Sequence, residues 1–123
     1  MRIHFLHHSA VCVALGESLL VFDYYRFARG KAIPDGHVSV EDIRAAGRAY
    51  VFASHAHNDH FDRRIFDWAD AGVPVTYILD DTISAANVPK STVLLSRGKA
   101  YDDGYIQVRE FGSTDMGGSF YVE

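Results

Sequence analysis

Residues 50–60, YVFASHAHNDH, hold the strongest signal in this sequence of 123 residues. The first four, Tyr50–Ala53, are apolar throughout, which is typical of a strand buried on both faces of a sheet. Three histidines and an aspartate follow within the next seven residues. The stretch therefore predicts a sheet with a functional site in the loop where this central strand ends.

The residue types in this loop are those that bind transition metals. His55 and His57, two residues apart in an extended or loop segment, point to the same side and can chelate one ion. Asp59 and His60 follow one turn later and are placed to reach a second ion, ~3.5–4 Å from the first. The alternative is a solvated polar loop that happens to hold three histidines. The pattern favours a metal site, with one or two ions of zinc, or of manganese or iron, which imidazole and carboxylate also suit.

The rest of the chain alternates short strand-like and helix-like segments. Strands are expected at Ile3–His7, Val11–Leu15, Leu19–Tyr24, Tyr50–Ala53, Val75–Leu79, Val93–Ser96, Tyr105–Phe111 and Ser119–Glu123. Helices are expected after the capping residues Ser39, Asp62 and Asp81, ending near Gly47, Ala71 and Ala86. No linker or repeat divides the sequence, so we expect residues 1–123 to form a single unit of the α/β (α+β) class.

Composition excludes several classes of protein. Apolar residues make up 48% and charged residues 23%, which argues against disorder. A net charge of −4 without basic runs does not favour a nucleic-acid partner. Cys12 is the only cysteine, so a disulfide-framed secreted module is excluded. The apolar run Ala10–Leu15 is too short for a signal peptide or a membrane span. We therefore expect a cytoplasmic protein with no membrane partner.

The pattern His-x-His-x-Asp-His after a buried strand resembles the signature of the metallo-β-lactamase superfamily. Residues 5–9 resemble the first-strand segment of the branch that contains ascorbate-phosphate lactonase-like hydrolases, and residues 20–23 resemble its third strand with a terminal aspartate. Residues 112–114 and 117–121 resemble the family's Gly-His-Thr loop and the strand that follows it. The resemblance implies a sandwich of two mixed, mostly antiparallel sheets with helices outside, of which this chain supplies the N-terminal half.

Two departures from the family pattern affect the site. Ser113 stands where the family has its third histidine for the first ion, and the family's bridging aspartate and last histidine would lie beyond Glu123. The expected ligands are the four that remain: His55, His57, Asp59 and His60. Three explanations stay open. The chain is a fragment of a longer hydrolase, two chains pair as a homodimer through uncovered inner sheets, or Asp115 substitutes as an oxygen ligand.

Two residues outside the loop are candidates for supporting roles. Asp23 ends a strand at the expected metal edge, where it either orients a ligand histidine by accepting its other ring N–H or caps a turn. His8 begins a turn beside the site. It is either a metal ligand or outer partner, or a turn histidine with a purely structural contact.

The function that these features predict is a metal-dependent hydrolase in which a metal-bound hydroxide attacks the substrate. Asp59, besides binding metal, orients the hydroxide and is the expected catalytic residue. By analogy with the lactonase-like branch, the substrate is a small lactone or a phosphorylated metabolite. One alternative is a catalytically silent half-domain that binds metal weakly or not at all. Another is a phosphodiesterase or nuclease of the same superfamily. A structural zinc module is disfavoured because such sites have four ligands, usually including cysteine.

Overall fold

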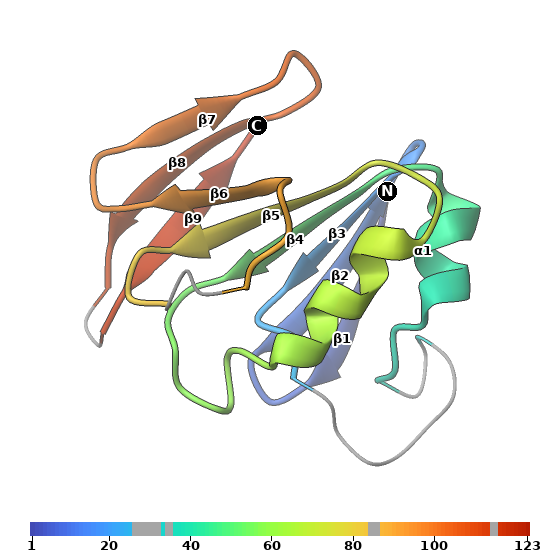
Figure 1. Ribbon diagram of the computed structural model, residues 1–123, viewed down its shortest axis with the longest axis horizontal. Coiled ribbons are helices and arrows are strands. Elements are labelled where there is room, and N and C mark those ends of the chain that lie inside the picture. Colours follow the sequence, from blue (N-terminus) through green and yellow to red (C-terminus); the bar gives the residue numbers. More distant parts are fainter. Residues whose placement is uncertain (26–32, 34–35, 84–86, 114–115) are drawn as a thin grey trace.

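The computed structural model describes residues 1–25, 33, 36–83, 87–113 and 116–123, which fold into two sheets and two helices (Figure 1). The elements, in chain order, are β1 (Arg2–His7), β2 (Ala10–Leu15), β3 (Ser18–Phe22), α1 (Val40–Ala46), β4 (Ala49–Ala53), the 3₁₀ helix η2 (Arg63–Asp70), β5 (Val75–Asp80), β6 (Thr92–Leu95), β7 (Ala100–Asp102), β8 (Gln107–Gly112) and β9 (Gly118–Val122). The α+β class predicted from the sequence is confirmed.

The larger sheet has six strands in the order β1-β2-β3-β4-β5-β6. The first three form an antiparallel meander, and β3 to β6 run parallel. All five residues of β4 are buried, as its apolar sequence indicates. Because β3 and β4 are parallel neighbours, their carboxyl ends meet at one edge of the sheet. Asp23 and the histidine loop follow these two ends, which explains how segments about thirty residues apart come together.

The two faces of the larger sheet have different covers. Helices α1 and η2 lie over one face, and the three-stranded sheet β7-β8-β9 packs on part of the other (Figure 1). Alternate residues of β4 serve the two cores: Val51 and Ala53 pack with the helices, whereas Tyr50 and Phe52 pack toward the second sheet. Burial on both faces fixes the position of β4, so the loop that follows it starts from a rigid point.

Local sequence accounts for the start and end of α1. The Ser39 side chain accepts a hydrogen bond from the Asp42 backbone N–H, and Asp42 accepts one from the Ser39 N–H at 2.8 Å. This is the capping box expected from the sequence. Gly47 ends the helix with φ 86°, a left-handed conformation that glycine adopts without steric cost.

The segment 63–70 is a 3₁₀ helix, and its buried face differs from the one expected. At α-helical spacing Ile65, Phe66 and Ala69 would share the inward face, but Ile65, Trp68 and Ala71 are the most buried. These three recur every third residue, the repeat of a 3₁₀ helix, so they line up on one face. Asp62 caps the helix as predicted, accepting from the Arg64 N–H at 2.9 Å.

Two further expectations were wrong. The third strand ends at Phe22, because Asp23 adopts φ 49° and leaves the extended conformation. A helix was expected from Asp81, but residues 81–83 form a turn, in which the Asp80 carboxylate accepts from the Thr82 N–H at 2.9 Å. The rest of that expected helix, residues 84–86, lies outside the described residues.

Strand β8 carries a buried carboxyl group. In the sequence, Phe111 groups with the apolar residues Ile106 and Val108, which predicts that it faces inward, but it is 50% exposed, whereas Glu110 is fully buried. Side chains two apart share a face of a strand, so Glu110 follows Ile106 and Val108 into the space between the sheets. Burial is the main cause that raises the pKa of Glu110 to about 8, and its interactions with Asp80 and Asp81 raise it further.

We expect Glu110 to lower the free energy of unfolding as the pH rises. The folded protein keeps this proton up to about pH 8, whereas an ordinary glutamate loses it near 4.5. Between these values the folded state binds more protons than the unfolded state, so the free energy of unfolding falls with pH. Glu110→Gln should remove this slope, which urea unfolding at about pH 5 and about pH 9 would measure.

The control for that experiment is Glu41→Gln, which neutralises an exposed glutamate in the first turn of α1. Its pH slope should match that of the unmodified protein. An equal slope in Glu110→Gln would contradict the assignment of the proton to Glu110.

Within the described residues, neither helix has the length and apolar character needed to cross a bilayer.

Candidate metal centre

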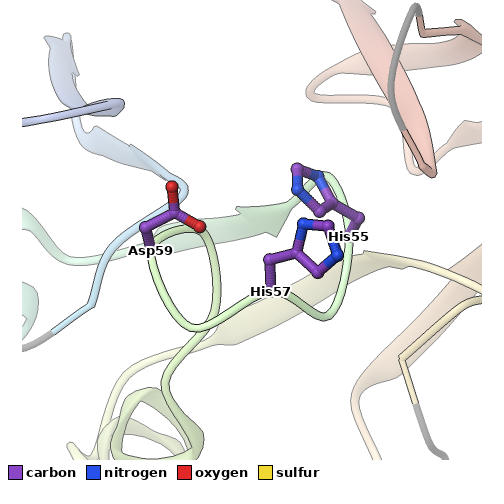
Figure 2. A group of neighbouring side chains, drawn as sticks. All are labelled: His55, His57 and Asp59. Carbon is purple, nitrogen blue, oxygen red and sulfur yellow. The ribbon is translucent and has the colours of Figure 1, made fainter.

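The loop after β4 brings three potential ligands together (Figure 2). One donor atom each from His55, His57 and Asp59 lies within 4.8 Å of the other two. His55 is buried, Asp59 is half-buried and His57 is exposed. Two imidazoles and a carboxylate at this separation suit a divalent transition metal, and the mixed burial leaves the group accessible from solvent.

His60, the fourth expected ligand, lies beside this group. Its ring centroid lies 4.0 Å from that of His55. Its Nε2 lies 3.5 Å from Asp59 Oδ2. A tight turn causes this approach, since the backbone N–H groups of His60 and Phe61 both donate to the carbonyl of His57, at 2.9 and 3.0 Å. All four residues predicted from the motif therefore lie side by side.

Asp23 fixes the orientation of these histidines through a hydrogen-bond network. Its carboxylate accepts from the Ser54 backbone N–H at 2.7 Å and from the Ser54 hydroxyl at 2.8 Å. It also lies 2.8 Å from Nδ1 of His60. Because a carboxylate only accepts, the His60 proton is on Nδ1, and Nε2 carries the electron pair that a metal takes.

Ser54 extends the network to His55. Its oxygen lies 3.0 Å from His55 Nδ1. The hydroxyl proton of Ser54 already goes to Asp23, so the serine oxygen accepts from His55 Nδ1–H. In that tautomer Nε2 is again the ring atom that can ligate an ion. Of the two roles that the sequence left open for Asp23, orienting a ligand histidine agrees with these contacts.

We expect Asp23→Asn to weaken metal binding by about 10–100-fold, the usual effect of losing an orienting carboxylate. The amide keeps the size of the side chain, but its NH₂ group replaces one of the two oxygens that accept hydrogen bonds from Ser54 and His60. At least one of these donors then faces another donor. Competition with a colorimetric chelator would measure the affinity. Asp42→Asn changes a carboxylate that contacts Ser39 at the start of α1, and serves as the control. An affinity equal to that of the unmodified protein would show that Asp23 does not orient the ligands.

Of the three other residues named from the sequence, the structure describes His8 and Ser113. His8 lies in the β1–β2 turn with Nδ1 3.8 Å from Asp59 Oδ2. Ser113 follows β8 and is exposed. Asp115, the proposed substitute ligand, lies outside the described residues.

Sequence reasoning missed the residues that hold the loop in place. Ser54 links Asp23 to His55, as described above. The Gly118 N–H donates to the carbonyl of Ser54 at 3.0 Å, and the Ser9 hydroxyl donates to the carbonyl of Asp59 at 2.9 Å. In the sequence, Ser54, Gly118 and Ser9 are marked only by their place next to the motif or in turn-like segments. Such a place does not predict these long-range contacts.

Cys12 takes no part in the centre. It is buried in β2, and burial raises the pKa of its thiol to about 12. A metal ligand must be a thiolate, so this cysteine is a core residue.

A hollow of about 470 Å³ adjoins the loop. It is lined by Ala56, Asn58, Phe61, Asp62, Arg63 and Ile83. This volume falls in the range of small-molecule sites.

No family model matches this sequence, and no curated protein matches it. The structure thus defines an α+β protein with a group of side chains that could hold a metal ion.

Proposed function

We propose that this protein is a metal-dependent hydrolase whose ion is held by the loop after β4. The observation that carries the proposal is the group His55, His57 and Asp59, whose donor atoms lie within 4.8 Å of one another. Three protein ligands leave a coordination position open, as catalytic sites require, whereas structural zinc sites are closed by four.

The residues of the loop have distinct tasks in this proposal. A bound ion supplies Lewis acidity, which strengthens water as a nucleophile near neutral pH and polarises the reacting oxygen of the substrate. The half-buried carboxylate of Asp59 accepts a hydrogen bond from the attacking water and so orients it. Asp23 and Ser54 keep the imidazoles in the tautomer that ligates.

The substrate that we favour is a small lactone or a phosphorylated metabolite. The hollow beside the loop has the size of a small-molecule site, and Arg63 lines it. The resemblance to the lactonase-like branch of the metallo-β-lactamase superfamily supports the same class. A net charge of −4 gives no support to a nuclease, although a phosphodiesterase of this superfamily remains the alternative. We place the protein in the cytoplasm, with zinc as the first choice of ion and manganese or iron as the others.

The first experiment is to measure metal content by elemental mass spectrometry on protein purified without chelators. We expect at least one equivalent of a transition metal per chain, together with turnover of lactone or phosphodiester substrates that stops when a chelator removes the metal. Protein without bound metal and without turnover would overturn the proposal. That result would favour the silent domain, for which Ser113 in place of a histidine is the argument.

We also propose a second copy of this chain as a partner. Strand β1 is an edge of the larger sheet. Its residues Ile3 and Phe5 are 64% and 70% exposed. They lie on the same face of the sheet as Val13 of β2, which packs against the core beneath the second sheet. Two such edges can pair about a two-fold axis, each covering the other's apolar side chains.

Phe5→Lys is therefore expected to convert a dimer into a monomer, because the charge would be buried against an apolar face. Light scattering after gel filtration would measure the mass. Tyr121→Lys alters a similarly exposed aromatic residue, 56% exposed on β9, and should leave the dimer intact. A monomeric unmodified protein would contradict the pairing.

A further inference from the structure

The buried carboxyl group of Glu110 lies beside a second acid. Among the described residues, no N–H or O–H group donates a hydrogen bond to either of its oxygens. The side chain that interacts with it is that of Asp80, at the end of β5, which is only 3% exposed. Two carboxylates cannot hydrogen-bond to each other, whereas a protonated carboxyl group donates to a carboxylate. Glu110 and Asp80 therefore share one proton.

The charges around Glu110 favour its protonated form. Burial is the largest cause of the rise of its pKa to about 8, and Asp80 and Asp81 raise it further. Two cations follow β6 in the chain: the guanidinium of Arg97 lies over β8, and Lys99 is exposed. In the described part of the chain neither of them donates a hydrogen bond to Glu110. A negative charge on Glu110 would therefore face Asp80 without a hydrogen-bonded cation.

The Glu110 side chain also lies against the start of β9. A Cβ added to Gly118 would be 2.6 Å from its Cγ and Cδ and 2.8 Å from its Oε1. The glutamate thus occupies the space that a larger residue at position 118 would need. Gly118 in turn donates its backbone N–H to the carbonyl of Ser54 at 3.0 Å. The position of Ser54 therefore depends on how Glu110 packs against β9.

Ser54 connects this buried pair of acids to the metal centre. Its hydroxyl donates to Asp23 at 2.8 Å, and its oxygen accepts from His55 Nδ1 at 3.0 Å. Asp80 is the residue of β5 that lies next to Ser54, because β4 and β5 pair in parallel up to the residues just before them. The two acids and the histidine loop thus lie at the same edge of the larger sheet.

We propose that Glu110 is a positioning residue of the metal centre. The proton that it shares with Asp80 keeps its side chain neutral and packed against Gly118, and Gly118 keeps Ser54 oriented toward His55. When this proton is lost, the two negative charges repel each other and β8 and β9 move away from β5. The hydrogen bond from Gly118 to Ser54 then weakens, and the loop binds metal less tightly. The proposal rests on the metal binding proposed above for the histidine loop.

The test is the Zn²⁺ affinity of the full chain, measured by competition with a colorimetric chelator at about pH 7 and about pH 9, on either side of the Glu110 pKa. Glu110→Gln imitates the protonated state at both values, because its amide is neutral and donates to Asp80. We expect this variant and the unmodified protein to bind Zn²⁺ equally at the lower pH. At the higher pH the unmodified protein should bind more weakly than the variant, by up to about tenfold, the limit for one proton at one pH unit above its pKa.

Two further variants separate positioning from a purely structural role. Glu41→Gln neutralises an exposed glutamate of α1, and its affinities should match those of the unmodified protein at both pH values. Asp80→Asn removes the other charge of the pair, while its amide can donate to Glu110. The loss of affinity between the two pH values should therefore be smaller in Asp80→Asn. If Glu110 were only a structural residue, its replacement would lower stability but leave the ratio of affinities the same at both pH values.

The outcomes distinguish this proposal from the one on which it rests. If the affinities of the unmodified protein and of Glu110→Gln change in parallel with pH, the positioning role is wrong and the metal centre stands. An undiminished loss of affinity in Asp80→Asn would overturn the shared proton. If the unmodified protein binds no Zn²⁺ at either pH, the metal centre fails and this inference fails with it. Circular dichroism at both pH values checks that each variant is folded.

Discussion

The double variant His55→Ala/His57→Ala is expected to lose its bound metal and, with it, all hydrolytic turnover. These residues supply two of the three donor atoms that lie within 4.8 Å of one another. A four-ligand zinc site binds with roughly 10–16 kcal/mol, or about 3 kcal/mol per ligand. Losing two ligands then costs about 6 kcal/mol, on the order of 10⁴-fold in affinity. Elemental mass spectrometry and a titration with Co²⁺, followed by visible absorption, would measure the loss.

Control variants keep this test informative. His55 is only 4% exposed, so its replacement also leaves a small cavity and lowers stability. His57 is exposed, and His57→Ala alone should lower affinity by about a hundredfold without unfolding the protein. His4→Ala removes a histidine of β1 and should change neither metal content nor turnover. Turnover that persists in the double variant would exclude the loop as the catalytic centre.

The parts of the fold predicted correctly from the sequence depend on local chemistry. The capping box of Ser39 and Asp42, the glycine that ends α1 and the apolar run of β4 each act within a few residues. The same holds for the histidine cluster, since His57 to His60 are brought together by backbone hydrogen bonds inside one turn. Short-range patterns of this kind can be recognised without knowing the rest of the structure.

The parts that were missed or left open depend on register between distant segments. The contact of Asp23 with Ser54 was missed, and its contact with a ligand histidine was one of two roles left open. Both follow from the parallel pairing of Phe22 with Phe52, a register that local sequence patterns do not specify. The burial of Glu110 was different, because strict alternation from Ile106 and Val108 already placed it inward. The signal was a charged residue on the apolar face of this strand, although the apolar character of the neighbouring Phe111 favours the opposite orientation.

Gly117 is the residue whose replacement should most disturb the site from outside the motif. We expect Gly117→Ala to lower the free energy of unfolding by about 3 kcal/mol, combining about 1 kcal/mol for an alanine at positive φ with about 2 kcal/mol for overpacking. Gly117 has φ 81°, and an added Cβ would overlap the carbonyl oxygen of Ser54 and lie 2.6 Å from the Cβ of His55. Both neighbours belong to the backbone or its first side-chain atom, so neither can rotate away. Urea unfolding would measure the change.

The same substitution should also disturb the metal centre, because Ser54 contacts Gly117 and belongs to the hydrogen-bond network of the histidine loop. A shift of the Ser54 carbonyl would break its hydrogen bond with the Gly118 N–H and move the hydroxyl that connects Asp23 to His55. We therefore expect a loss of metal affinity of at least tenfold together with the loss of stability.

Gly72→Ala separates the steric effect from the backbone effect. Gly72 has φ 83°, nearly the same conformation, but nothing lies within 4 Å of an added Cβ. This variant should lose only the ~1 kcal/mol of the backbone term and keep its metal affinity. If Gly117→Ala is no less stable than Gly72→Ala and binds metal normally, the start of β9 does not hold the histidine loop. If the two losses occur together in Gly117→Ala alone, close packing of β9 against Ser54 keeps the ligands in position.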